Sequence, residues 1–133
     1  MKAVFADTFF YLALLNDEDT AHSRAVAESR VNRPIVTTEF VVLELGNACA
    51  RASDHTDFLA LVDGMRASFR IRIIPLSSGL LQRGLELMRS RSDKDWSLTD
   101  CTSFVAMEEA GLEEALTGDQ HFEQAGFKAL LKA

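Results

Sequence analysis

The sequence predicts a single domain of the α/β class, a three-layer α/β/α sandwich around a mainly parallel central sheet. Short apolar segments of strand length alternate with longer segments of helix length, and this alternation is typical of parallel sheets whose strands are joined by helices. The chain has 133 residues, the usual size of one domain. Hydrophobic residues make up 47% and charged residues 26%, as in folded globular proteins. We therefore expect one domain over residues 1–133.

The first half of the chain predicts two strands and four helices. Residues 2–6 are short and apolar, and they end at Asp7 and Thr8, where Thr8 is expected to cap the first helix. In residues 54–68, apolar residues recur at helical intervals, which makes this segment amphipathic. The expected elements are a strand over 2–6, helices over 8–15 and 21–31, a strand over 34–37, and helices over 38–51 and 54–68.

The second half predicts three strands and three helices. Residues 70–74 alternate charged and apolar side chains, which is typical of a strand, and Pro75 ends them. Ser97 opens a helix that Gly111 stops, after a polar, irregular stretch in which Trp96 is expected to pack over the edge of the core. The remaining expectations are a strand over 70–74, helices over 77–91 and 97–110, a strand over 115–117, a helix over 121–125 and a strand over 127–131.

The composition excludes several classes of protein. A net charge of −6 argues against binding nucleic acid by bulk positive charge, although excess carboxylates can serve an enzyme that holds metal ions. The longest apolar runs fall short of the roughly 20 residues that a membrane span needs, so no membrane contact is expected. Cys49 and Cys101 form no CxxC pair and are expected to be buried, reduced thiols of a cytoplasmic protein.

Three acidic residues stand at the ends of predicted elements. Asp7 and Asp119 follow predicted strands, and Asp100 lies in the first turn of a predicted helix. Parallel sheets place their sites at the carboxyl ends of the strands, so these side chains are candidates for a shared site. Each acid alone also has an ordinary explanation, because Asp7 could cap the helix after the first strand, Asp100 could favour a helix N-terminus and Asp119 could serve a turn.

A fourth acid, Glu44, shares the apolar side of its predicted helix with Val41, Leu45 and Ala48. A charge there is costly unless it is paired or bound to a metal; otherwise it reaches water or an arginine. If folding brings all four acids together, they cannot all stay ionised without a counter-charge. Mg²⁺ and Mn²⁺ are hard ions that suit such oxygen-rich sites.

The order of these acids resembles that of a PIN-domain ribonuclease. Asp7 closes the first strand, and Glu44 lies in the apolar helix after Thr37 and Thr38. The motifs SLTDC at 97–101 and LTGDQHF at 116–122 carry the third and fourth acids. The resemblance covers residues 4–131. More narrowly, the chain is similar to the toxin half of a VapBC-type toxin–antitoxin pair.

The resemblance implies a magnesium-dependent endoribonuclease, with Mn²⁺ as a plausible substitute. The catalytic and metal-binding residues it implies are Asp7, Glu44, Asp100 and Asp119, with Asp7 and Asp100 as the principal direct ligands. Thr8 and Thr99 match polar positions that help to order the site, and Asp95 matches an acidic position near it. His121 is expected beside the site, and His22 and His55 at the surface.

The resemblance also implies partners besides an RNA substrate. A cognate antitoxin would lie across the acidic pocket and often place an Arg or Lys in it, which fits the negative charge expected there. The helices over 21–30 and 54–68 could supply a homodimer face or an antitoxin groove, or they could simply pack in the core. Several arginines could hold flanking phosphates, although a solvated face is the favoured interpretation: Arg66, Arg70, Arg72, Arg89 and Arg91.

Two alternatives remain open at this point. A haloacid-dehalogenase-like phosphatase also uses an Asp after its first strand, but it usually carries a second Asp two residues later, where this chain has Phe9. A non-catalytic PIN-like interaction module would share the fold and lack the metal. Retention of all four acids argues moderately against that module.

Overall fold

The computed structural model describes residues 1–133 and contains one sheet of five strands, every one parallel to its neighbours. The predicted α/β class is confirmed, and the sheet is wholly rather than mainly parallel. The spatial order is β3-β2-β1-β4-β5, so β1 lies at the centre. The strands are β1 (Val4–Ala6), β2 (Ile35–Thr38), β3 (Ile71–Ile74), β4 (Glu114–Leu116) and β5 (Lys128–Ala129).

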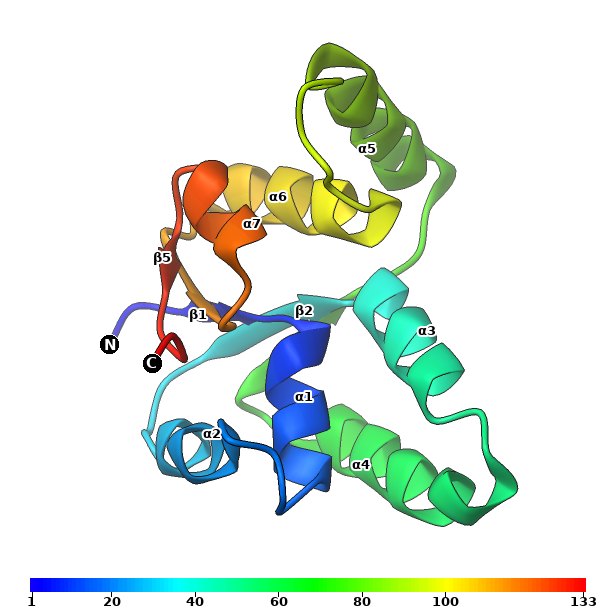
Figure 1. The fold of residues 1–133 in the computed structure, drawn as a ribbon, viewed down its shortest axis with the longest axis vertical. Helices are drawn as coiled ribbons and strands as arrows, with labels where there is room; N and C mark the ends of the chain where they lie inside the picture. Colours follow the sequence, from blue (N-terminus) through cyan, green and yellow to red (C-terminus); the bar gives the residue numbers. More distant parts are fainter.

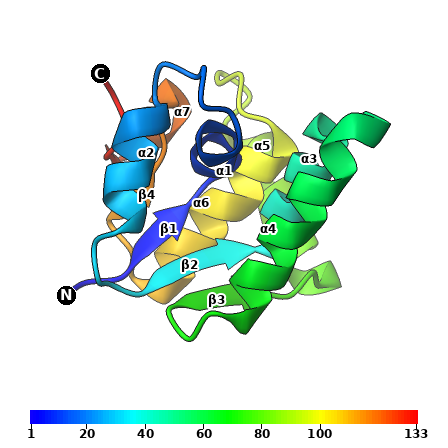
Figure 2. The same cartoon turned by 90° about the horizontal axis from the view of Figure 1, so that it is seen from below.

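Helices cover both faces of this sheet and complete three layers. Helices α1, α2 and α4 lie on one side and α5, α6 and α7 on the other (Figures 1 and 2), while α3 extends from the end of β2. The helices are α1 (Thr8–Leu15), α2 (His22–Ser29), α3 (Glu39–Ala48), α4 (His55–Ala67), α5 (Ser78–Ser90), α6 (Leu98–Ala110) and α7 (Gln120–Gln124). None of them combines the length and the apolar character that crossing a membrane requires.

Every predicted element is present, and the differences lie at the ends. β1 begins at Val4 rather than residue 2, because its ladder starts where the Val4 amide donates to the Pro34 carbonyl at 3.1 Å. The last strand is only Lys128–Ala129, and an unpredicted 3₁₀ turn, Ala52–Asp54, precedes α4. Such shifts of a few residues are usual where a pattern fades gradually.

The predicted cap of the first helix was wrong. Asp7, not Thr8, occupies the N-cap position of α1, and its side chain makes no capping hydrogen bond. Thr8 is the first residue inside the helix, and its hydroxyl donates to Glu44 Oε1 at 2.6 Å. Both side chains are therefore free of helix capping and point into the region at the end of the sheet.

The core is built on β1 and α6. All three residues of β1 are fully buried, as a central strand between two helix layers requires. In α6, Phe104 packs its ring edge-on against Trp96 and Phe122, with ring centroids about 5 Å apart. Trp96 is buried there, as predicted, and both cysteines are free and buried.

Close packing of α5 on α6 depends on Gly84. A Cβ atom at this position would lie 2.6 Å from the Thr102 methyl group and 3.4 Å from the Thr102 backbone nitrogen. Thr102 cannot easily rotate away, because it is β-branched and its hydroxyl donates to the Thr99 carbonyl at 2.9 Å. The two helices therefore meet at a distance that only glycine permits.

We predict that Gly84→Ala lowers the free energy of unfolding. Overpacking usually costs about 1–3 kcal/mol, and the higher helix propensity of alanine offsets part of this cost. Gly64→Ala in α4 is the matched control, because nothing lies within 4 Å of a Cβ there. That control should be neutral or stabilising by up to about 1 kcal/mol. Urea unfolding measures both; equal effects of the two substitutions would contradict the packing described.

Candidate active site

The candidate site lies at the carboxyl edge of the sheet, between β1 and β4. The chain proceeds from β1 to β2 and β3 on one side and then returns to β4 and β5 on the other, so this is the point where the strand order reverses. Because Ala6 pairs with Leu116, the next residues, Asp7 and Thr117, are also neighbours. The Thr117 hydroxyl donates to Asp7 Oδ2 at 3.1 Å.

Asp7 is the most perturbed acid of the site. Its side chain is almost wholly buried, and this burial raises the pKa of Asp7 from 3.8 to about 7. The negative charges of Asp100 and Glu44 raise that pKa as well, whereas the Thr8 amide and the Thr117 hydroxyl lower it. The folded chain thus holds an acid that is costly to ionise without a cation.

Asp100 performs two tasks at the start of α6. Its Oδ2 accepts from the Ser97 amide at 3.1 Å while the Ser97 hydroxyl accepts from the Asp100 amide at 3.0 Å, which together form a capping box. Asp100 as a whole is 8% exposed, and burial raises the pKa of its carboxyl group above the usual range. Its position is therefore fixed by the helix that it caps.

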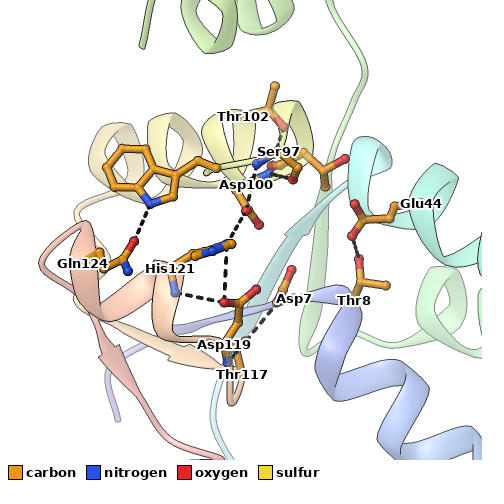
Figure 3. A network of polar contacts seen from close by, with 12 residues as sticks. Asp7, Thr8, Glu44, Ser97, Asp100, Thr102, Thr117, Asp119, His121 and Gln124 are labelled. Atoms are coloured by element: carbon orange, nitrogen blue, oxygen red, sulfur yellow. Dashed lines mark hydrogen bonds and ion pairs between the residues drawn. The ribbon is translucent and has the colours of Figure 1, made fainter. Parts of the chain in front are cut away.

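Asp119, in the loop after β4, and His121, in the first turn of α7, approach Asp100 (Figure 3). Asp119 is the N-cap of α7, and its Oδ1 accepts from the His121 amide at 2.9 Å. The His121 Nδ1 atom lies 3.0 Å from Asp100 Oδ2 and 3.5 Å from Asp119 Oδ1. Thr117 joins the two sides of the cluster, because its hydroxyl also accepts from the Asp119 amide at 3.1 Å.

Glu44 faces this cluster from α3 and is held by the Thr8 hydroxyl (Figure 3). No arginine or lysine pairs with it. One pocket of about 360 Å³ includes all four predicted acids, so folding brings them together as expected. Its lining residues are Asp7, Thr8, Phe9, Leu12, Glu44, Asp95, Ser97, Asp100, Asp119 and His121.

Of the three residues expected to support the site, two line the pocket and one does not. Thr8 and Asp95 line the pocket, as predicted. Thr99 does not line it, because it sits one residue before Asp100 on the helix and its carbonyl accepts from Thr102 inside α6. Any effect of Thr99 must therefore act through the geometry of the helix.

The donor set of the pocket suits a hard divalent cation. Oxygen atoms of Asp100 and Asp119 and a nitrogen of His121 lie within 4.8 Å of one another, close enough to share one ion. Asp7 and Glu44 lie outside this closest group but border the same pocket. No Lys or Arg lines it to compensate the buried negative charge. Carboxylate oxygens are the ligands that magnesium and manganese prefer.

Two important residues were missed or understated from the sequence. His121 was expected only beside the site, although its place two residues after Asp119 in LTGDQHF was a usable signal. Thr117 was not singled out, although it follows β4 as Asp7 follows β1. His22, expected at the surface, is half-buried with Nδ1 2.7 Å from the Ala13 carbonyl, and of the three histidines only His55 is exposed.

The arginines weighed as possible phosphate contacts do not line the pocket. Arg70 donates to the carbonyls of Val31 at 2.6 Å and Ser29 at 3.0 Å, which ties the start of β3 to the end of α2. Arg91 pairs with Asp93 at 3.1 Å. None of the five arginines singled out in the sequence lines the acidic pocket, so the solvated or structural interpretation is the better one.

Comparison with known proteins places the chain among nucleases. The family model described as PIN domain matches residues 4–128. The 23S rRNA-specific endonuclease VapC20 of Mycobacterium tuberculosis is 30% identical over 125 residues, in both strain CDC 1551 and strain H37Rv. That alignment covers 93% of this chain and 95% of VapC20.

Solved structures agree in fold. The crystal structure of M. tuberculosis VapC20, described as a sarcin–ricin loop cleaving toxin, superposes with a TM-score of 0.83 at 26% identity, over 93% of this chain and 95% of that one. VapBC2 of Rickettsia felis, bound to a promoter DNA fragment, gives 0.69 at 13% identity over 96% and 97%. FitAcB of Neisseria gonorrhoeae gives 0.63 at 15% identity over 95% of both chains; these last two show the fold alone.

We predict that Asp7→Asn stabilises the metal-free protein above neutral pH. The folded-state pKa of Asp7 is raised above its ordinary value of 3.8, so its contribution to stability is present in full only below about pH 4 and is lost progressively until the pH passes about 7. Asparagine has no charge to desolvate, so the variant should gain on the order of 1–4 kcal/mol at pH 8, since one pKa unit is about 1.4 kcal/mol. Urea unfolding in EDTA at pH 5 and 8 measures the difference.

The matched control for this prediction is Asp17→Asn, because Asp17 is exposed in the loop after α1. Its stability should follow that of the unaltered protein at both pH values. A stability difference between Asp7→Asn and the unaltered protein that does not grow with pH would show that Asp7 is not the buried acid described.

Proposed function

The chain belongs to the PIN-domain family, and on this basis we propose that it is a metal-dependent endoribonuclease, the toxin of a VapBC-type toxin–antitoxin pair acting in the cytoplasm. The observation that carries the proposal is the pocket: four carboxylates from distant parts of the sequence border it, and no Lys or Arg does. The relationship to an rRNA endonuclease over 93% of the chain supports RNA as the substrate class.

Mg²⁺, with Mn²⁺ as a substitute, is the cofactor that we propose. Asp7 and Asp100 would hold it directly, with Glu44 and Asp119 completing the set of oxygen donors. A divalent cation supplies Lewis-acid chemistry for the hydrolysis of a phosphodiester by water. The fit rests on the donor set and on the raised pKa values of Asp7 and Asp100, which describe carboxylates in need of a positive charge.

The chain's own residues hold the acids in place before any substrate arrives. The Thr117 hydroxyl fixes Asp7, the Ser97 amide fixes Asp100, and the Thr8 hydroxyl fixes Glu44. Preorganisation of this kind removes the cost of ordering the site during the reaction. The acidic lining also repels a phosphodiester, so RNA should enter the pocket only when a cation compensates the charge.

The two alternatives fare differently. The phosphatase alternative is set aside, because family membership is shown and Phe9 stands where that class has its second acid. Phe9 packs its ring against Gly118, where a Cβ would lie 2.5 Å from it. The non-catalytic module remains the rival, and RNA cleavage by the purified chain decides between it and the nuclease.

We propose that the antitoxin places a basic side chain in the acidic pocket. A cation from a partner would compensate the same charge that a metal compensates, and it would exclude both metal and RNA. This explains how one pocket can serve the reaction and its inhibition. The pocket is open to such a group, because Glu44, Asp119 and His121 are only half-buried.

We also propose a homodimer, with a different face from those suggested by the sequence. The apolar sides of α2 and α4 turn into the core, where Ala25, Val62 and Met65 are buried. The better candidate is a hollow of about 320 Å³ between α3 and the start of α5, to which Leu76 and Leu81 contribute exposed apolar surface. Exposed patches of this kind are typical of protein interfaces.

The nuclease proposal predicts that the antitoxin-free chain cleaves RNA with Mg²⁺ and not with EDTA. Asp7→Asn and Asp100→Asn should each lower the cleavage rate at least about a hundredfold, since even outer-shell partners of a metal are worth about 10–100-fold. Asp57→Asn is the matched control, because Asp57 is exposed on α4. Gel analysis of total RNA measures the rates; full activity of Asp7→Asn or in EDTA would refute the proposal.

The dimer proposal predicts that Leu81→Glu converts a dimer into a monomer, because a charge in an apolar interface is costly to desolvate. Leu59→Glu is the matched control: Leu59 is 57% exposed and lies on α4, outside the hollow. Sedimentation velocity measures both variants and the unaltered chain. A monomeric unaltered chain, or equal dissociation of the two variants, would contradict the assigned face.

A further inference from the structure

We propose that His121 is a direct metal ligand, so that the site joins one nitrogen donor to its carboxylates and binds Mn²⁺ in preference to Mg²⁺. This inference rests on the proposed function, because it concerns the same pocket. It assigns to His121 a role that the four-acid pattern does not contain. The residue is then a determinant of metal specificity rather than a neighbour of the site.

The distances fit coordination without movement of the backbone. The His121 Nδ1 atom lies 3.0 Å from Asp100 Oδ2 and 3.5 Å from Asp119 Oδ1. Adjacent donors on an octahedral ion are about 3 Å apart when each bond is about 2.1 Å long. The His121 and Asp100 donors are therefore already at this spacing, the His121 and Asp119 donors are slightly farther apart, and all three side chains offer donors within 4.8 Å of one another.

The fold holds the imidazole in this place. The His121 amide donates to Asp119 Oδ1, so the two residues are fixed to one another. The next residue, Phe122, is fully buried and packs edge-on against Phe104 of α6. Helix α7 is thereby anchored to the helix that carries Asp100, and the ring stays at the pocket.

A hydrogen bond to Asp100 is the competing role, and the two roles exclude each other. Nδ1 either carries a proton that it donates to Asp100 or uses its lone pair to bind a metal. Asp100 does not need the histidine to keep its orientation, because the Ser97 amide donates to the same Oδ2 atom at 3.1 Å. His121 can therefore leave the hydrogen bond for the ion without releasing Asp100.

A nitrogen ligand changes which ion the pocket prefers. Mg²⁺ favours sites made only of oxygen, whereas imidazole suits the transition metals and their affinities rise from Mn²⁺ onward. With His121 as a ligand, Mn²⁺ should bind more tightly than Mg²⁺. Asp7 and Glu44 remain oxygen donors on the other side of the pocket, so Mg²⁺ is still accepted.

The test uses Mn²⁺ alone as the probe and the full chain, unlabelled or carrying ¹⁵N-histidine. Electron spin-echo envelope modulation reports a nitrogen bound to Mn²⁺ directly, and the modulation should change on ¹⁵N labelling. It should vanish in His121→Asn and persist in His55→Asn, which alters an exposed histidine. The labelled, unaltered chain gives a result even where the His121 variant fails to fold.

Calorimetry of the same samples gives the second readout. His121→Asn should reduce the preference for Mn²⁺ over Mg²⁺ by about tenfold or more, whereas His55→Asn should leave it unchanged. Mn²⁺ binding without nitrogen modulation would overturn the role of His121 and leave the nuclease proposal standing. Absence of any Mn²⁺ binding would overturn both, since the pocket would then hold no metal.

Discussion

The constraint on which this molecule depends is the gathering of negative charge at the end of a buried parallel sheet. Asp7 and Asp100 are both withdrawn from water, and neither has a Lys or Arg beside it. A folded protein tolerates such charge only by protonating it or by binding a cation. The raised pKa of Asp7 favours protonation of that acid, whereas the donors grouped around Asp100 are arranged to bind a cation.

The fold creates this constraint through its topology. Parallel strands deliver the residues that follow them to one edge, and the reversal of strand order beside β1 leaves room there. Hydroxyl groups rather than Lys or Arg side chains hold the carboxylates in position, since Thr8 and Thr117 each donate a hydrogen bond to a carboxylate of the cluster. Neutral donors hold the acids without neutralising them, so their attraction for a cation is kept.

The sequence predicted the layers, the α-helices and strands, and the convergence of four acids, because each depends on periodicity or on position after a strand, whereas the short 3₁₀ turn at Ala52–Asp54 was not predicted. The residue pattern did not place the Thr8 hydroxyl on Glu44 or the His121 ring within 3.0 Å of Asp100. Threonine is a common helix-capping residue, so the sequence favoured that role for Thr8. The position of α3 in the fold is what allows the Thr8 hydroxyl to donate to Glu44 instead. The distance of His121 from Asp100 depends on how α7 packs on α6, a tertiary contact that no local pattern records.

Asp100 belongs both to the cluster and to the cap of α6, whereas Asp7 makes no capping bond. The two acids therefore differ in what their loss means over evolutionary time. A lineage that drifts toward an inert copy can discard Asp7 and keep a sound scaffold, but discarding Asp100 also removes half of a capping box. Decayed paralogues of this chain should accordingly lose the acid at position 7 first, and they should persist as folded proteins available for other uses.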